Sequence, residues 1–241
     1  MPTVFLLRHG LTAMTGPTLA GRLPGVHLNE RGAEQASAAA TRLAALPLAA
    51  VVTSPLERCA ETAKAVVKAQ RTAGRAPASR TDRRLLECDY GDWTGKQIKA
   101  LAKDPLWPVV QAHPSGVSFP GGEAMASMAE RAVRAIRDQD AKIAAEHGPD
   151  ALWVACSHGD VIKAILADAL GMHLDLFQRI VVDPCSISAI RYTAGRPFVL
   201  VSNDTSGDLS RFVPPPAKPG KRRRVAASDA TVGGGAGSGS V

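Results

Sequence analysis

The chain has 241 residues, of which 45% are hydrophobic and 4% aromatic, and it carries a formal net charge of +7 at pH 7. This length and apolar content predict an alanine-rich soluble α/β protein with one large core or two small ones. Because no stretch approaches eighteen uninterrupted apolar residues and no basic segment with an apolar core opens the chain, we expect a cytoplasmic protein that is neither exported nor membrane-inserted.

In the N-terminal part, two apolar runs predict buried strands, each followed by a helix. Residues 3–7 do not alternate with polar residues, so we expect the first strand to be buried on both faces. Residues 29–46 have the apolar spacing of a helix that Asn29 caps. The other expected features are an inner helix face of Ala33, Ala36, Ala40 and Leu43, a strand over 48–54, a helix from about residue 55 with Pro55 in its first turn, and a third strand near 79–86.

The C-terminal part continues the alternation and ends in a hairpin. The expected elements are a long helix from about Gly122 to Glu146 with Met125, Met128, Ala132, Ile136 and Ile143 inside, a strand over 151–157, a helix over 160–170, and two strands over 186–194 and 197–204. The β-α-β order predicts a three-layer α/β/α sandwich with a mostly parallel central sheet.

The last residues, 214–241, are rich in proline, glycine and serine and carry most of the net charge. Lys218, Lys221 and the arginines at 222–224 are balanced only by Asp229, so this segment contributes +4 of the +7. We expect a disordered tail over 214–241 and one folded domain over 1–213. A solvated tail with incidental charge is the favoured interpretation, and a contact with nucleic acid or another polyanion is the alternative.

Four cysteines, Cys59, Cys88, Cys156 and Cys185, are far apart and form no CxxC pair. This spacing argues against a zinc cluster or a disulfide framework and predicts reduced core residues.

Arginine and histidine residues follow three of the predicted strands at the point where each strand ends. Arg8-His9-Gly10 follows the first strand, residues 54–58 follow the second and include Arg58, and Ser157-His158-Gly159 follows the strand over 151–157. Because ligands bind outside the carboxyl ends of parallel strands, we expect these groups at one edge of the sheet. Guanidinium forks and helix N-termini would bind a phosphoryl group there, with Gly10 and Gly159 allowing close backbone approach.

Each of these motifs has a simpler explanation when taken alone. "RHG" and "SHG" occur by chance, His158 could be a hydrogen-bonded structural histidine, and Arg58 could pair with Glu57 or Glu61. Their order, each directly after an apolar strand, favours a phosphate site.

The stretches "LLRHGLT", "LNERGAEQA", "VVTSPLERCAETA", "LLECDYGDWTG", "PGGEAM" and "ACSHGDVI" resemble the histidine phosphatase superfamily, which includes cofactor-dependent phosphoglycerate mutases. The resemblance runs in order from residue 3 to about residue 205. It implies a phosphoglycerate mutase-like fold and two-step phosphoryl transfer through a phosphohistidine, with no metal and no cofactor.

The resemblance also implies a role for particular residues. His9 matches the nucleophile, whose ring must be neutral, with its other nitrogen donating to a backbone carbonyl. Glu87 matches the proton donor to the leaving alcohol, which needs a raised pKa that burial beside Cys88 and Tyr90 would supply. Arg8 and Arg58 match phosphate-binding arginines, and His158 matches the second histidine. Thr12 matches a position in the phosphate pocket, with a local turn as the alternative. Arg22 matches a substrate-binding position at the rim, with an exposed loop arginine as the alternative.

Two positions depart from the pattern of the family. The loop "TAMTGPTLAG" lacks the asparagine of many relatives, and Thr94 stands where many have glutamate. Asp89 and Asp92 are nearby acids that compete with Glu87 for the donor role.

Residues 95–122 are the expected substrate lid, with Lys96, Lys99 and Lys103 at helical spacing, followed by Trp107 and later Phe119. The segment lacks paired arginines for a phosphoglycerate, and "PGGEAM" resembles the phosphatase branch. We therefore predict a metal-independent phosphomonoester hydrolase acting on a small phosphorylated metabolite. The alternatives are a phosphomutase and a non-catalytic phosphate-binding protein with a nucleic-acid-binding tail, and a homo-oligomer stays open.

Overall fold

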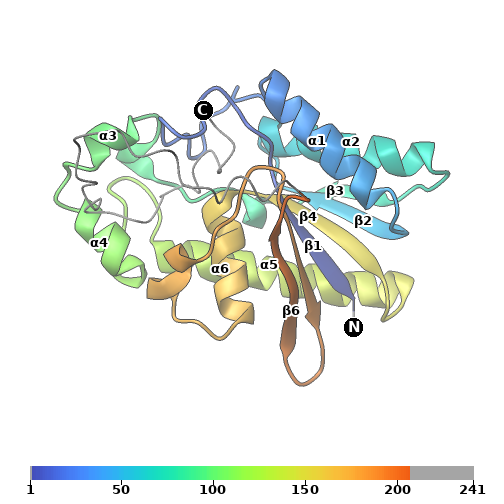
Figure 1. Cartoon of the computed structure of the whole chain (residues 1–241). Coiled ribbons are helices and arrows are strands. Elements are labelled where there is room, and N and C mark those ends of the chain that lie inside the picture. The colour runs from blue at the N-terminus through green and yellow to red at the C-terminus, as the bar shows by residue number, and fades with distance from the viewer. Residues whose placement is uncertain (1, 207–241) are drawn as a thin grey trace, which may run out of the picture.

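A computed structural model describes residues 2–206 (Figure 1). The strands are β1 (Thr3–Arg8), β2 (Leu48–Thr53), β3 (Ala78–Thr81), β4 (Leu152–Ser157), β5 (Ile187–Tyr192) and β6 (Pro197–Asp204); the helices are α1 (Glu30–Leu43), α2 (Glu57–Thr72), α3 (Ile98–Leu101), α4 (Trp107–Ala112), α5 (Met125–His147) and α6 (Gly159–Ala169). The domain end predicted at residue 213 and the tail predicted over 214–241 lie outside the described residues.

The described strands form one six-stranded sheet in the order β3-β2-β4-β1-β5-β6. Strands β3, β2, β4 and β1 pair in parallel, whereas β5 is antiparallel to β1 and to β6. The predicted mostly parallel sheet and the hairpin at its edge are confirmed. Because β1 and β4 are parallel neighbours in the middle of the sheet, the segments that follow them lie side by side.

Helices cover both faces of the sheet, as predicted, and each face has its own apolar core. Helices α1 and α2 lie on one face, and α5 and α6 lie on the other (Figure 1). Successive residues of β1 enter opposite cores: Leu6 packs with the α5 and α6 residues, and Leu7 packs with the α1 and α2 residues. The first strand is therefore buried on both faces, as its unbroken apolar run predicts.

Several local predictions are wrong in their exact position. Ala33 is exposed, and Gly32 takes the inner position of α1 instead. Pro55 lies before α2, because Leu56 is the N-cap and has the extended backbone of that position. Strand β3 ends at Thr81, since the Asp82 side chain accepts a hydrogen bond from Arg84 N and starts a 3-10 turn.

The segment over 95–122 contains α3 and α4 and packs mainly through its aromatic residues. Trp107 stacks on Trp93 with ring centroids 6.0 Å apart, and Phe119 meets Trp93 edge-on at 5.4 Å. Both Trp107 and Phe119 are therefore core residues, while Lys96, Lys99 and Lys103 are exposed. A lid function for this segment stays a prediction.

All four cysteines are buried free thiols, as predicted. No helix among residues 2–206 combines the length and the apolar content that a bilayer crossing needs.

The loop after β1 and the start of α1 approach each other through two glycines. A Cβ atom on Gly10 would lie 2.5 Å from the Gly32 carbonyl oxygen, and a Cβ atom on Gly32 would overlap the Leu11 carbonyl. Gly10 was expected to admit a bound anion, but the close neighbour of its Cβ position is α1. This contact fixes the chain immediately after Arg8 and His9.

We expect Gly32→Ala to lower the free energy of unfolding by about 1–3 kcal/mol, because the added methyl group displaces the Leu11 carbonyl. Helix propensity alone predicts the opposite sign, a gain of about 1 kcal/mol. Urea unfolding followed by circular dichroism measures the difference, with Ser37→Ala at an exposed position of α1 as the control. An alanine at position 32 that leaves stability unchanged contradicts the close packing described above.

Candidate active site

Two histidines lie together at the carboxyl ends of β1 and β4. The register places Arg8 opposite Ser157, so His9 and His158 leave the sheet as neighbours. His9 N donates to Ser157 O at 3.0 Å, and the two imidazole rings meet edge-on with centroids 5.3 Å apart. The structure thus brings the two predicted histidines into one site.

The His9 ring is held as a neutral imidazole with one nitrogen unprotonated. Its Nδ1 lies 2.7 Å from the Gly10 carbonyl, and because a carbonyl can only accept, Nδ1 carries the proton. Burial, together with the positive charges of Arg58 and Arg8, holds the pKa of His9 well below its usual value. Nε2 therefore keeps its lone pair at neutral pH and can attack an electrophile.

Arg8 and Arg58 bring two buried positive charges to this site. Arg8 Nη1 donates to Val182 O at 2.8 Å, and Arg58 Nη2 donates to Gly21 O at 2.7 Å. Within residues 2–206, Nε and Nη1 of Arg58 are buried without a hydrogen-bond acceptor. Buried guanidinium donors that the protein does not satisfy are suited to an anionic ligand.

His158 is fixed by a serine at the end of β2. It is fully buried at the N-cap of α6, and its Nε2 lies 2.8 Å from Ser54 Oγ. Burial, Arg58, His9 and Arg8 hold the pKa of His158 well below its usual value. This neighbour of the nucleophile candidate is therefore also neutral.

Glu87 is a buried carboxyl group beside the arginines. Its Oε1 accepts a hydrogen bond from Cys88 N at 2.9 Å. Burial and then the negative charge of Asp160 raise the pKa of Glu87 to about 7. The hydrogen bond from Cys88 N and the charges of the two arginines lower this pKa, but their effect is smaller. Glu87 can therefore both give and take a proton near neutral pH.

A cavity of about 40 Å³ joins His9, the two arginines and Glu87, and His158 is not part of its lining. The lining residues are Arg8, His9, Thr12, Thr15, Gly16, Thr18, Leu19, Ala20, Gly21, Arg58, Glu87, Tyr90 and Ile98. Thr12 is one of the lining residues, which agrees with a place in the phosphate pocket. Its hydroxyl also bonds Thr15 Oγ1 at 2.9 Å and accepts from Met14 N, which agrees with a local turn.

Two rival acids and Arg22 lie outside this lining. Asp89 pairs with Arg22 at 3.2 Å, and Asp92 is exposed, so of the three acids only Glu87 lines the cavity in the described part of the chain. Arg22 binds the protein through each guanidinium nitrogen: Nε to Glu87 O, Nη1 to Asp89 and Nη2 to Glu123. A substrate contact for Arg22 stays a prediction. Its observed contacts are with residues 84–89, called here the Glu87 loop, and with Glu123.

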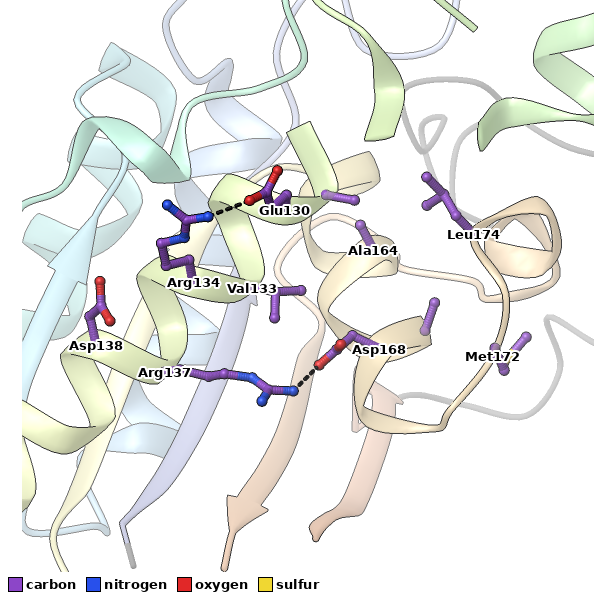
Figure 2. A pocket seen from close by; sticks show the side chains of 11 residues that line it. Glu130, Val133, Arg134, Arg137, Asp138, Ala164, Asp168, Met172 and Leu174 are labelled. Atoms are coloured by element: carbon purple, nitrogen blue, oxygen red, sulfur yellow. Dashed lines mark hydrogen bonds and ion pairs between the residues drawn. The ribbon is translucent and has the colours of Figure 1, made fainter. Parts of the chain in front are cut away.

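A wider hollow of about 560 Å³ lies between α5 and α6 (Figure 2). Val133 and Ala164 form part of its apolar floor, and the ion pair of Arg137 with Asp168 crosses its rim (Figure 2). Its lining shares no residue with the smaller cavity and contains no histidine, serine or cysteine. The chemistry is therefore concentrated at the strand ends.

Sequence reasoning missed several residues around the site. Ser54 holds His158, and the carboxylate of Asp160 accepts a hydrogen bond from Tyr90 OH at 2.8 Å. A serine directly after the second strand and an acid in "SHGD" were the available signals, but each is also an ordinary turn or helix-start residue. The contacts of Glu123 and Arg131 with the Glu87 loop join distant segments and left no local signal.

Comparison with known proteins gives a consistent result. Residues 4–205 match the family model of the "Histidine phosphatase superfamily (branch 1)". The "Bifunctional protein Rv2228c" of Mycobacterium tuberculosis is 34% identical over 84% of this chain and 54% of its own length, so the chain spans about half of that relative. A "Probable phosphoglycerate mutase GpmB" of Proteus mirabilis is 29% identical over 88% of this chain and 95% of its own. The structure of a mycobacterial glucosyl-3-phosphoglycerate phosphatase superposes with a TM-score of 0.72 at 26% identity, covering 83% of this chain and 98% of that one.

We expect the Glu87 carboxyl to titrate near pH 7, and Asp160→Asn to move that titration to lower pH because a negative charge that favours the protonated form is removed. Carboxyl ¹³C NMR with Glu87→Gln for assignment measures both values. Asp140→Asn is the control, since this buried carboxyl accepts a hydrogen bond from Trp153 near the start of β4, at the opposite end of that strand from His158. An ordinary carboxyl pKa for Glu87 would show that burial does not govern it.

Proposed function

This chain belongs to the histidine phosphatase superfamily, and we propose that it hydrolyses phosphate monoesters of a small metabolite through a phosphohistidine on His9, without a metal ion. The observation that carries the proposal is the neutral His9 ring, with Nε2 unprotonated, in a buried cavity lined by Arg8 and Arg58. The phosphatase among the similar structures supports the same reaction class.

In the first step, His9 Nε2 attacks the phosphorus atom of the bound ester. The N–P bond forms as the bond from phosphorus to the ester oxygen breaks, and Glu87 gives its proton to that oxygen, so that an alcohol leaves. Arg8 and Arg58 offset the charge on the phosphoryl oxygens. The Gly10 carbonyl continues to accept from Nδ1 and stabilises the positive charge that develops on the ring.

In the second step, water attacks the phosphorus atom of phospho-His9. Glu87, now a carboxylate, takes a proton from the water as the N–P bond breaks. The electron pair of that bond returns to Nε2, inorganic phosphate leaves, and both residues regain their starting protonation states. A pKa of about 7 suits Glu87 to both directions of transfer.

Charge in the cavity supports hydrolysis over phosphoglycerate isomerisation. A mutase of that type also binds the substrate carboxylate, which calls for cations beyond the phosphate site. Among residues 2–206, the cationic side chains that line the cavity are Arg8 and Arg58. The mutase relative keeps isomerisation as the second candidate. Phosphate binding without turnover, with nucleic acid on the basic tail, is the third.

We expect His9→Ala to lower kcat for p-nitrophenyl phosphate by about 10³-fold or more, because His9 is the one imidazole among the described residues that line the cavity. Brief reaction with ³²P-labelled substrate and an alkaline quench should give an alkali-stable, acid-labile label on the native protein and none on the variant. Both measurements are made with chelator present. His147→Ala, at an exposed position at the end of α5, is the control. Turnover by the His9 variant at the native rate would contradict the proposed mechanism.

With 3-phosphoglycerate as substrate, we expect any turnover to release inorganic phosphate and to give no 2-phosphoglycerate. Phosphorus NMR follows both products in one sample, and a panel of phosphorylated metabolites in the same assay ranks the substrates. Accumulation of the isomer in place of phosphate would favour the mutase.

A further inference from the structure

The main chain of Glu87 is held by two arginines that come from distant parts of the sequence. Its carbonyl oxygen accepts from Arg22 Nε at 2.9 Å and from Arg131 Nη2 at 3.0 Å. Arg22 lies in the loop after β1, and Arg131 lies on α5. Because a carbonyl oxygen has two lone pairs, these two charged donors use its full capacity.

Glu123 joins the two arginines to each other. Its Oε1 accepts from Arg22 Nη2 at 2.8 Å and from Arg131 Nη2 at 2.6 Å, and its Oε2 accepts from Arg131 Nε at 3.0 Å. Between 18% and 31% of these side chains is exposed, so the three charges are largely shielded from solvent. Charge-assisted, two-pronged contacts of this kind fix geometry as well as adding attraction.

The same group extends along the chain on both sides of Glu87. Arg131 Nη1 also donates to Arg84 O at 2.6 Å and to Leu86 O at 2.8 Å. On the other side, Asp89 N donates to Glu123 Oε1 and Glu123 N donates to Asp89 O, each at 2.9 Å. A Cβ atom on Gly122 would overlap that Asp89 carbonyl, so the two loops are in direct contact.

Glu87 reaches the phosphate cavity, but its holders do not. Among the described residues, the cavity lining includes Glu87 and excludes Arg22, Glu123 and Arg131. The hydrogen bonds that join these three side chains to a residue of the lining both go to Glu87. A proton donor acts only within hydrogen-bond reach of the leaving oxygen, and small displacements are costly in rate.

We propose that Arg22, Glu123 and Arg131 form a clamp that positions Glu87 for proton transfer to the leaving alcohol. This inference rests on the proposed function. The three are positioning residues, and none of them is expected to contact the substrate. The clamp explains why Arg22 faces the Glu87 loop and why "PGGE" is placed beside "LLECDYG".

Two substrates that differ in their need for a proton test the clamp. The phenolate of 2,4-dinitrophenyl phosphate leaves without protonation, whereas the alkoxide of glycerol 2-phosphate must be protonated. The ratio kcat/KM covers the steps up to release of the alcohol, so it reports on Glu87 as an acid. We expect Glu123→Gln and Arg22→Gln each to lower kcat/KM for glycerol 2-phosphate by about tenfold or more, and for 2,4-dinitrophenyl phosphate by about threefold or less.

Inhibition by inorganic phosphate provides a readout that a general loss of structure would change. The phosphate-binding arginines are outside the clamp, so its inhibition constant should stay within about twofold of the native value. Arg22→Gln is the second variant, for the case that Glu123→Gln does not fold. Arg22 is the most exposed member of the clamp, and its loss leaves the Arg131 contacts in place. Glu130→Gln is the matched control: it breaks the surface ion pair with Arg134 on α5, and neither substrate should be affected.

Glu87→Gln and His9→Ala separate failure of the clamp from failure of the proposed function. If His9→Ala retains hydrolysis, the proposed function fails; if Glu87→Gln slows both substrates equally, the acid role of Glu87 fails. The clamp proposal is overturned if Glu87→Gln is selective but the clamp variants slow both substrates equally, slow neither, or weaken phosphate inhibition.

Discussion

The site depends on the burial of two guanidinium charges beside two imidazoles. Arg8 and Arg58 are removed from water by the sheet edge and the loops above it, and an unbalanced buried charge is expensive. The carbonyls of Val182 and Gly21 satisfy part of each guanidinium. The rest of the balance comes from carboxylates and, in our proposal, from the dianionic substrate. Burial, and then the same positive field, keep His9 and His158 neutral. In our proposal the neutral His9 is the nucleophile, and His158 adds no charge beside it.

Glu87 is subject to opposing influences within that field. The arginines favour its ionised form, whereas burial and Asp160 favour its protonated form and prevail. The cavity therefore contains an unprotonated imidazole together with a carboxyl group that is partly protonated near neutral pH, where a carboxyl group of usual pKa would be ionised. Asp160 is itself held by Tyr90, which also lines the cavity. The protonation pattern thus follows from groups on β1, α2, α6 and the loop after β3 taken together, and not from any one side chain.

The sequence was enough to predict features that depend on neighbouring residues, but not those that depend on contacts between distant segments. His9 and His158 directly follow apolar strands, and Arg58 lies in the first turn of the helix after β2, so strand order was enough to place them at one edge. Glu87 was found only through its motif, because no strand or helix of its own directs it. The hydrogen bonds of Arg131 with the Glu87 loop span more than forty residues, and periodicity carries no information about such contacts. Trp107 and Phe119 were expected near the substrate because aromatic residues serve pockets and cores alike; in the structure they fill the core.

The place of β1 in the sheet has a consequence for biosynthesis. This strand precedes both of its neighbours, β4 and β5, by a long stretch of sequence, with Thr3 paired to Leu152 on one side and to Arg191 on the other. During synthesis, β1 cannot form its first ladder until some 150 further residues have been made, and its second ladder needs more. Closing so long a loop is entropically costly. Until β4 and β5 have been synthesised, His9 at the end of β1 therefore stays in a segment that has no partner strand, and the site cannot assemble.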